Sequence, residues 1–162
     1  MAFSGITIAQ NLFSETHNAD AQNGFGMSIA ARDDASYAGT PASLGTVTVT
    51  ENETSGFYSG IIVANNVDLD SFTLNNNLIT GGVVSIHTMG SADGTLTMRN
   101  NSIKGASGYL IMNEAVGTID ARQNWFGTPF IEFFETLLLG QIDYDPSLEN
   151  GDDMSTATGF QK

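Results

Sequence analysis

Short segments of this chain alternate apolar and polar residues, and one such segment recurs five times. Each copy reads apolar-x-apolar-x-x-Asn, and the copies begin at Ile6, Val47, Phe72, Leu96 and Ile119. An alternation with a period of two residues is typical of a β-strand. The last four Asn residues are 25, 24 and 23 residues apart (52 to 77, 77 to 101, 101 to 124). A repeat of this length predicts a solenoid of stacked β-coils.

The Asn that ends each copy has a physical explanation. Asn tolerates the left-handed backbone that a tight turn needs, and its amide carries both a donor and an acceptor. Equivalent turns of a stacked coil are about 4.8 Å apart, so each Asn can bond to the next one. We therefore expect an internal ladder of five side chains, Asn11, Asn52, Asn77, Asn101 and Asn124.

Two looser series supply further sides of each coil. Apolar segments at 27–29, 61–63, 84–86 and 110–112 precede the repeated strands. Short pairs at 12–13, 78–79, 102–103 and 125–126 follow the Asn. Three strand segments per coil predict an all-β fold, a parallel β-helix of about five coils. We assign residues 1–148 to a single β-helix domain, with an inserted loop at 31–45 and a polar, flexible tail at 149–162.

The repeat ends in a segment with the signals of a helix. Thr128 fits an N-cap and Pro129 the first helical position, and an apolar run from Phe130 to Leu139 ends at Gly140. We expect residues 128–140 to form a helix that covers the last coil, because an open coil exposes apolar core and strand edges. Its capping side chains are expected to be Trp125, Phe130, Phe133, Phe134 and Leu137. The same segment could instead take part in a junction between chains.

The charge balance excludes several classes of partner. The chain has 18 acidic and five basic residues, a net charge of −13. Nucleic acids and anionic membranes demand a basic surface. No apolar run is long enough to span a bilayer, so we expect no membrane insertion. Cys is absent, which excludes a disulfide framework. The first residues do not have the form of a signal peptide.

The end of the repeat resembles a known family. Residues 119–127, which include Asn124-Trp-Phe-Gly127, are followed by Asp143-Tyr-Asp-Pro146. This looks like the closing signature of right-handed parallel β-helix proteins of the pectate-lyase-like fold. The resemblance extends over residues 45–148. It implies a right-handed helix and a C-terminal position for the signature. It leaves the activity open, since the family includes pectate-lyase-like enzymes, surface adhesins, phage tail fibres and structural repeats.

The candidate chemistry is sparse. Polysaccharide hydrolysis needs two cooperating carboxyl groups, and no such Asp cluster with a His is present. His17 and His87 are isolated in the sequence. Short acidic pairs at 68–70, 143–145 and 150–153 could hold Ca²⁺, but none matches a full loop motif. Residues suited to contact a glycan are Tyr58, Tyr109, Arg99 and Arg122. The two arginines share one column, where they could pair with Asp120 or bind an acidic sugar.

A threonine array marks one side of the predicted coil. Its members are Thr46, Thr48, Thr73, Thr95, Thr97 and Thr118. Ranked Thr-x-Thr pairs on a flat β-solenoid face resemble ice-binding surfaces. Thr is also favoured on exposed strands for packing reasons, so the array alone does not decide the function.

Repeats and a cap without a catalytic cluster predict a non-catalytic module. We expect a structural or adhesive part of a cell surface, matrix fibre or phage appendage. It would assemble with itself or neighbouring subunits through its coil ends and contact polysaccharide on its sides. A carbohydrate-active enzyme or its inactive relative is the alternative, and an ice-binding protein is a further one. Only five residues precede Ile6, too few for an N-terminal cap, so the first coil is expected to pair with something.

Overall fold

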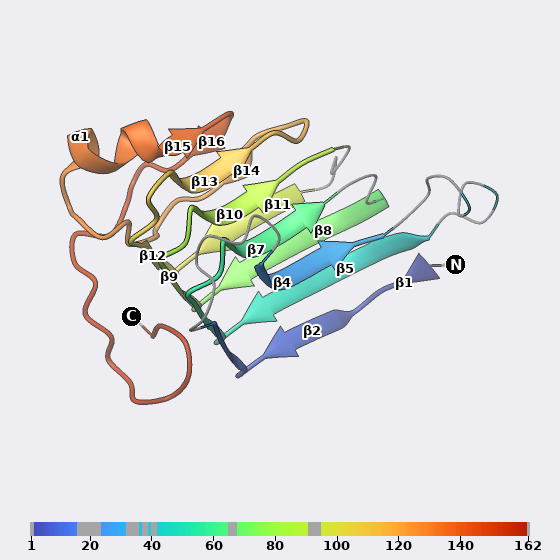
Figure 1. Ribbon diagram of the computed structural model, residues 1–162, viewed down its shortest axis with the longest axis horizontal. Helices are drawn as coiled ribbons and strands as arrows, with labels where there is room; N and C mark the ends of the chain where they lie inside the picture. Colours follow the sequence, from blue (N-terminus) through green and yellow to red (C-terminus); the bar gives the residue numbers. More distant parts are fainter. Residues whose placement is uncertain are drawn as a thin grey trace.

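The computed structural model describes residues 2–15, 24–31, 36, 39, 42–64, 68–90 and 95–161. This part of the chain is a parallel β-solenoid (Figure 1), as the repeat predicts. Three sheets run along it. Sheet A contains β1 (Ala2–Phe3), β2 (Ile6–Ala9), β5 (Ser43–Thr50), β8 (Asp68–Asn75), β11 (Thr95–Arg99), β14 (Ile119–Asp120) and β16 (Ile142–Asp143).

The other two sheets complete each turn. Sheet B contains β3 (Leu12–Ser14), β6 (Glu53–Ser55), β9 (Leu78–Thr80) and β12 (Ser102–Lys104). Sheet C contains β4 (Phe25–Ala30), β7 (Ser59–Ala64), β10 (Val84–Thr88), β13 (Tyr109–Asn113) and β15 (Leu138–Leu139). The described residues therefore make about four complete turns rather than the expected five. The fifth turn is partial, because sheet B continues there only as an isolated bridge between Ser102 and Trp125.

Equivalent positions of successive turns stack in register. In sheet A, Val47 pairs with Phe72 and Phe72 with Leu96, and all three are buried. Side chains of a strand alternate between its two faces, so the apolar positions of the repeat form one continuous core inside the coil. The prediction of the inserted loop falls largely on residues outside the described part, and β5 already begins at Ser43.

The Asn column joins the turns at the corner between sheets A and B. The backbone N–H and Nδ2 of Asn52 both donate to Oδ1 of Asn77, at 2.9 and 3.1 Å. The same pair of bonds links Asn11 to Asn52, Asn77 to Asn101 and Asn101 to Asn124. Asn11 is exposed, whereas the other four are buried, because no described turn lies beyond the first.

We expected the ladder Asn to adopt the left-handed backbone of this corner. The residue before it adopts that conformation instead. Positive φ values of 54–60° occur at Gln10, Glu51, Asn76, Asn100 and Gln123. None of these five residues is buried, while the Asn that follows each of them bonds to an adjacent turn. The ladder therefore selects Asn for its inward hydrogen bonds rather than for its backbone preference.

The C-terminal helix is shorter than predicted. Helix α1 spans Ile131–Phe134 and a 3₁₀ turn, η2, spans Glu135–Leu137. Leu138 and Leu139 belong to β15, because they pair with Ile111 and Met112 of β13. The N-cap is Phe130 and not Thr128, whose Oγ1 instead accepts a hydrogen bond from the Phe130 N–H at 3.3 Å.

Only part of the predicted capping set covers the last coil. Phe134 is buried and stacks on Phe126, with ring centroids 4.8 Å apart. Leu137 packs against the same core, and Trp125 is half-buried. Phe130 and Phe133 are instead 56% and 65% exposed and lie edge-to-face on each other. So short a helix turns only one side toward the coil, which leaves these two rings outside.

The C-terminal segment leaves the capping end and runs back beside the solenoid (Figure 1). Residues 152–157 are exposed, as the polar sequence predicts. The segment does not end as a free tail, however, because Gly159 and Phe160 are buried. The N–H of Phe160 donates to the carbonyl of Asn76 at 2.8 Å. The apolar ring explains this difference, since it leaves water by packing on the solenoid.

Candidate functional site

The outer face of sheet A carries the predicted threonine array. Thr7, Thr48, Thr73 and Thr97 pair in succession, and the column continues into Asp120 and Asp143. A neighbouring column contains Thr46, Ser71 and Thr95 in register, with Thr118 just before β14. Thr46, Thr95 and Thr118 are exposed, whereas Thr48, Thr73 and Thr97 are half-buried between their neighbours. The array is thus a ranked hydroxyl surface that changes into charge toward the capping end.

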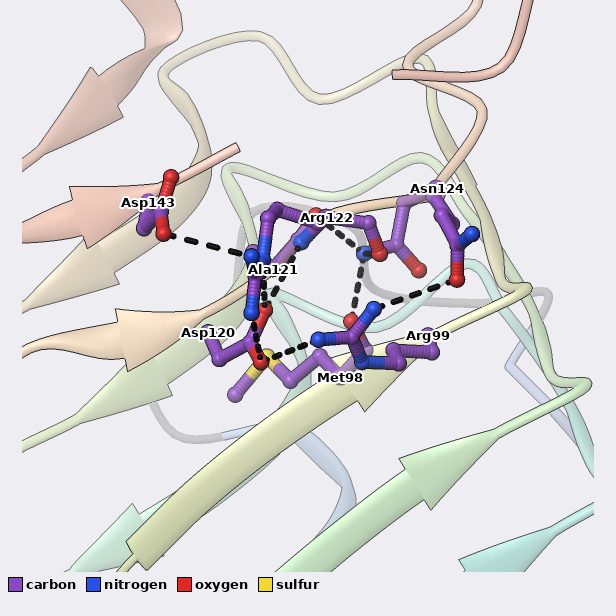
Figure 2. Close-up of polar contacts among 8 residues, drawn as sticks. Met98, Arg99, Asp120, Ala121, Arg122, Asn124 and Asp143 are labelled. Carbon is purple, nitrogen blue, oxygen red and sulfur yellow. Dashed lines mark hydrogen bonds and ion pairs between the residues drawn. The ribbon is translucent and has the colours of Figure 1, made fainter. Parts of the chain in front are cut away.

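The charged end of this face is a compact cluster (Figure 2). Arg122 donates from Nε and Nη2 to the two carboxylate oxygens of Asp120, both at 2.9 Å. Arg99, one turn away, donates from Nη2 to Oδ2 of the same carboxylate. Nε of Arg122 also lies 3.6 Å from Oδ2 of Asp143. Two arginines and two aspartates therefore balance each other on adjacent turns.

This arrangement fixes the ionisation of Asp120. The hydrogen bond from Arg122, with a further one from Arg99, holds the pKa of the Asp120 carboxyl well below its usual range. In return, Asp120 raises the pKa of Arg122. A carboxyl group that stays ionised cannot donate a proton to a leaving oxygen. The cluster therefore has the electrostatics of a structural ion-pair network rather than of an acid catalyst.

The same contacts bear on glycan binding. Both arginines are engaged with Asp120, and Arg99 also donates to Oε1 of Gln123 at 3.1 Å. Tyr109 is the first residue of β13 in sheet C, and Tyr58 lies in the turn just before β7 of the same sheet. Both are half-buried. The predicted glycan-contact residues thus divide between two sides of the coil. The structure does not bring them together into one site.

One polar contact between turns was not anticipated from the sequence. Nε2 of His87 lies 2.8 Å from Oε2 of Glu114, although the residues are 27 positions apart. That separation is close to one turn of the solenoid, which would have been the signal to find the pair. His87 is isolated in the sequence, and the fold brings Glu114 to it from the next turn. His17 lies outside the described residues.

Metal binding finds little support in the described geometry. Within that part of the chain, no group of three or more His, Cys, Asp or Glu side chains could hold a metal ion. Asp143, one member of a predicted calcium pair, faces Arg122 instead. The side chain of Asp68 lies outside the described atoms. Likewise, the described helices include none that is long and apolar enough to cross a membrane.

We compared the chain with known proteins and found no relative. The chain has no significant match among protein-family models, characterised proteins or solved structures. The class that the geometry defines is therefore the parallel β-solenoid. Any narrower assignment rests on the residues described above.

Proposed function

We propose that this protein is a non-catalytic β-helix module that acts outside the cell as a structural or adhesive part and assembles with itself through its coil ends. The observation that carries the proposal is the incomplete burial of the first described turn. Ile6, Ile8 and Phe13 point into the coil but remain half-buried, whereas their partners in the next turn are fully buried.

The first turn also has the chemistry of an interface. Its strands β2, β3 and β4 are edge strands in the described sheets, with one side unpaired. Phe3, Leu12 and Phe25 on these or neighbouring strands are 50%, 66% and 42% exposed. An unpaired strand edge with apolar side chains is a template for another chain, and a monomer rarely leaves such a surface uncovered. A second copy is the occupant that we propose.

The opposite end also exposes apolar side chains. Phe130, Ile131, Phe133 and Leu139 are exposed on or beside the capping helix. β15 and β16 there end sheets C and A, so both sheets have an edge at each end of the coil. Two unlike ends that meet head to tail produce an open-ended series of subunits rather than a closed dimer.

The absence of catalysis is also part of the proposal. Asp120 is held as a carboxylate by two arginines, which removes it as a proton donor. The extracellular location and polysaccharide contact follow from the resemblance to β-helix surface proteins. A glycan array tests the contact, and release of unsaturated oligosaccharides from polyuronates with Ca²⁺ would overturn the non-catalytic assignment.

Electron microscopy with matched variants tests the assembly. We expect the wild-type chain to form linear particles whose length increases with concentration. Leu12→Lys places a charge on the edge of the first turn and should shorten or abolish them. Thr95→Lys adds the same charge on an exposed middle turn and should leave them unchanged. Equal shortening by both variants, or single particles at every concentration, would refute assembly through the first turn.

A second candidate function rests on one specific observation, the register of the threonine column. Thr48, Thr73 and Thr97 occupy equivalent positions on consecutive turns, which spaces them about 4.8 Å apart. Such a rank could order water and bind ice. The test is thermal hysteresis of the wild type against Thr73→Lys. Hysteresis in the wild type that the variant loses would establish ice binding, and its absence in both would exclude it.

A further inference from the structure

Gly159 and Phe160 are anchored in a small binding site on the solenoid. Phe160 is 1% exposed, yet it does not belong to the main core inside the coil. Its N–H donates to the carbonyl of Asn76 at 2.8 Å, at the corner between sheets A and B. We call the site formed by the corner residues Glu51 and Asn76 the Gly-Phe slot, after the residues that occupy it.

The slot selects glycine before the aromatic ring. Gly159 has a φ of +97°, which L side chains rarely adopt. A Cβ at this position would collide with the Asn76 carbonyl oxygen and would lie 2.6 Å from Cα of Glu51. The backbone of the tail therefore approaches the corner as closely as only glycine allows. A site with one buried aromatic anchor, one main-chain hydrogen bond and a steric requirement for glycine can discriminate between sequences.

The tail also presents the Gly-Phe pair as a formed loop. The N–H of Met154 donates to the carbonyl of Gln161 at 2.7 Å, and the N–H of Gln161 donates to Oδ1 of Asp153 at 3.2 Å. Nε2 of Gln161 bonds to the carbonyl of Thr158 at 2.9 Å. These bonds lie within the tail and do not depend on the rest of the chain. When these few bonds open, the segment can extend away from the slot.

The connection between solenoid and loop has length to spare. Gly151 lies against the indole of Trp125 on the partial fifth turn, and residues 152–158 separate it from Gly159. Seven residues reach roughly 23–25 Å when extended. The slot lies two to three turns away, about 10–14 Å along the solenoid axis. Such slack is the condition under which a terminal segment can exchange between subunits.

We propose that residues 152–161 form a transferable strap, which occupies its own Gly-Phe slot in a single chain and the slot of the adjacent copy in an assembly. The inference rests on the proposed end-to-end assembly. A copy stacked on the capping end has its slot beyond one helix, about 10 Å thick, and one to two turns, about 5–10 Å. This distance is within reach of the connection. In a single chain, the slot is occupied by the strap of the same chain, because the effective concentration of that strap is on the order of millimolar.

The test uses a fluorescein-labelled synthetic peptide of residues 149–162 and the full-length chain. The receptor is the Phe160→Ala chain, whose slot is empty, and fluorescence anisotropy measures binding. We expect saturable binding to this chain and at least tenfold weaker binding to the wild type, whose own strap competes. Peptides that carry Gly159→Ala or Phe160→Ala should not bind. No saturable binding, equal binding to both chains, or retained binding of the altered peptides would each overturn the strap.

A second receptor guards against misfolding. Gly159→Ala in the full chain empties the slot by a different change, and circular dichroism checks that both variants keep their β structure. The two receptors should bind the peptide alike. Light scattering of the same samples separates this inference from the proposed function. Peptide binding in a chain of constant mass supports the slot and refutes the assembly, whereas assembly without peptide binding refutes only the strap.

Discussion

Removal of one central Asn tests the ladder that joins the turns. Asn77 is buried, and its Oδ1 accepts from both the N–H and Nδ2 of Asn52. In Asn77→Ala the buried N–H of Asn52 loses its acceptor. Nδ2 of Asn52 keeps its bonds to the carbonyls of Ile8 and Thr50. Oδ1 of Asn101 loses one of its two donors and keeps the other. The carbonyls of Val49 and Asn75 each lose the hydrogen bond from Nδ2 of Asn77.

The expected cost follows from this count. A buried donor without a partner costs about 1–3 kcal/mol, and each further hydrogen bond lost costs about 0.5–1.5 kcal/mol. We expect Asn77→Ala to lower the free energy of unfolding by about 3–4 kcal/mol, a large part of the total of about 5–15 kcal/mol. The matched control is Asn11→Ala at the exposed end of the ladder. Water can replace its bonds, so we expect a loss of about 1 kcal/mol or less.

Urea unfolding followed by Trp125 fluorescence and far-ultraviolet circular dichroism measures both variants. The comparison holds if the dependence of the free energy on urea is unchanged, because then only stability has altered. Equal losses for Asn77→Ala and Asn11→Ala would refute the reasoning, since it depends on the burial of Asn77 and on the bonds that its Oδ1 accepts from Asn52. So would a loss below about 1 kcal/mol for the central residue.

Three further predictions concern the ion pairs, the close approach of turns and the cap. The pKa of Asp120 is lowered in the folded state, so its stabilisation is fully present above the unfolded value of about 3.9 and is lost progressively as the pH falls from there through the lower folded value. Asp120→Asn should cost about 1–2 kcal/mol at pH 7 and clearly less near pH 2, as denaturant titrations at the two pH values would show. Gly60→Ala should cost about 1–3 kcal/mol in chemical denaturation, because its Cβ would lie 2.6 Å from the Ser85 carbonyl oxygen. Phe134→Ala should cost about 3–5 kcal/mol, while Phe133→Ala, on the exposed side, should stay within about 0.5 kcal/mol; similar melting temperatures would contradict the division of the cap.

The sequence predicts the coil well because every turn repeats the same pattern of apolar and Asn positions. Identical apolar and Asn positions stack on themselves, so one repeat determines the core and the ladder together. The left-handed corner could not be assigned in this way, since Gln10 and Glu51 have no strong preference for it. There the inward hydrogen bonds of the next residue decide the backbone.

The ends of the coil are harder to predict, because no repeat constrains them. Phe130 and Phe133 are as apolar as Phe134, and only the geometry of a single helical turn determines which ring is buried. One sequence feature could have predicted the packed end of the tail, namely a single aromatic residue, Phe160, in a polar segment. The contact between His87 and Glu114 could have been predicted from their separation in the sequence, which is close to one turn.

Light scattering of the purified chain over a wide range of concentration tests the central claim most directly. The exposed apolar side chains at the first described turn and at the capping end predict a mass that starts near the 17.1 kDa monomer and rises continuously with concentration, as in an open-ended series. A mass that stays at the monomer value at every concentration would contradict assembly through the coil ends.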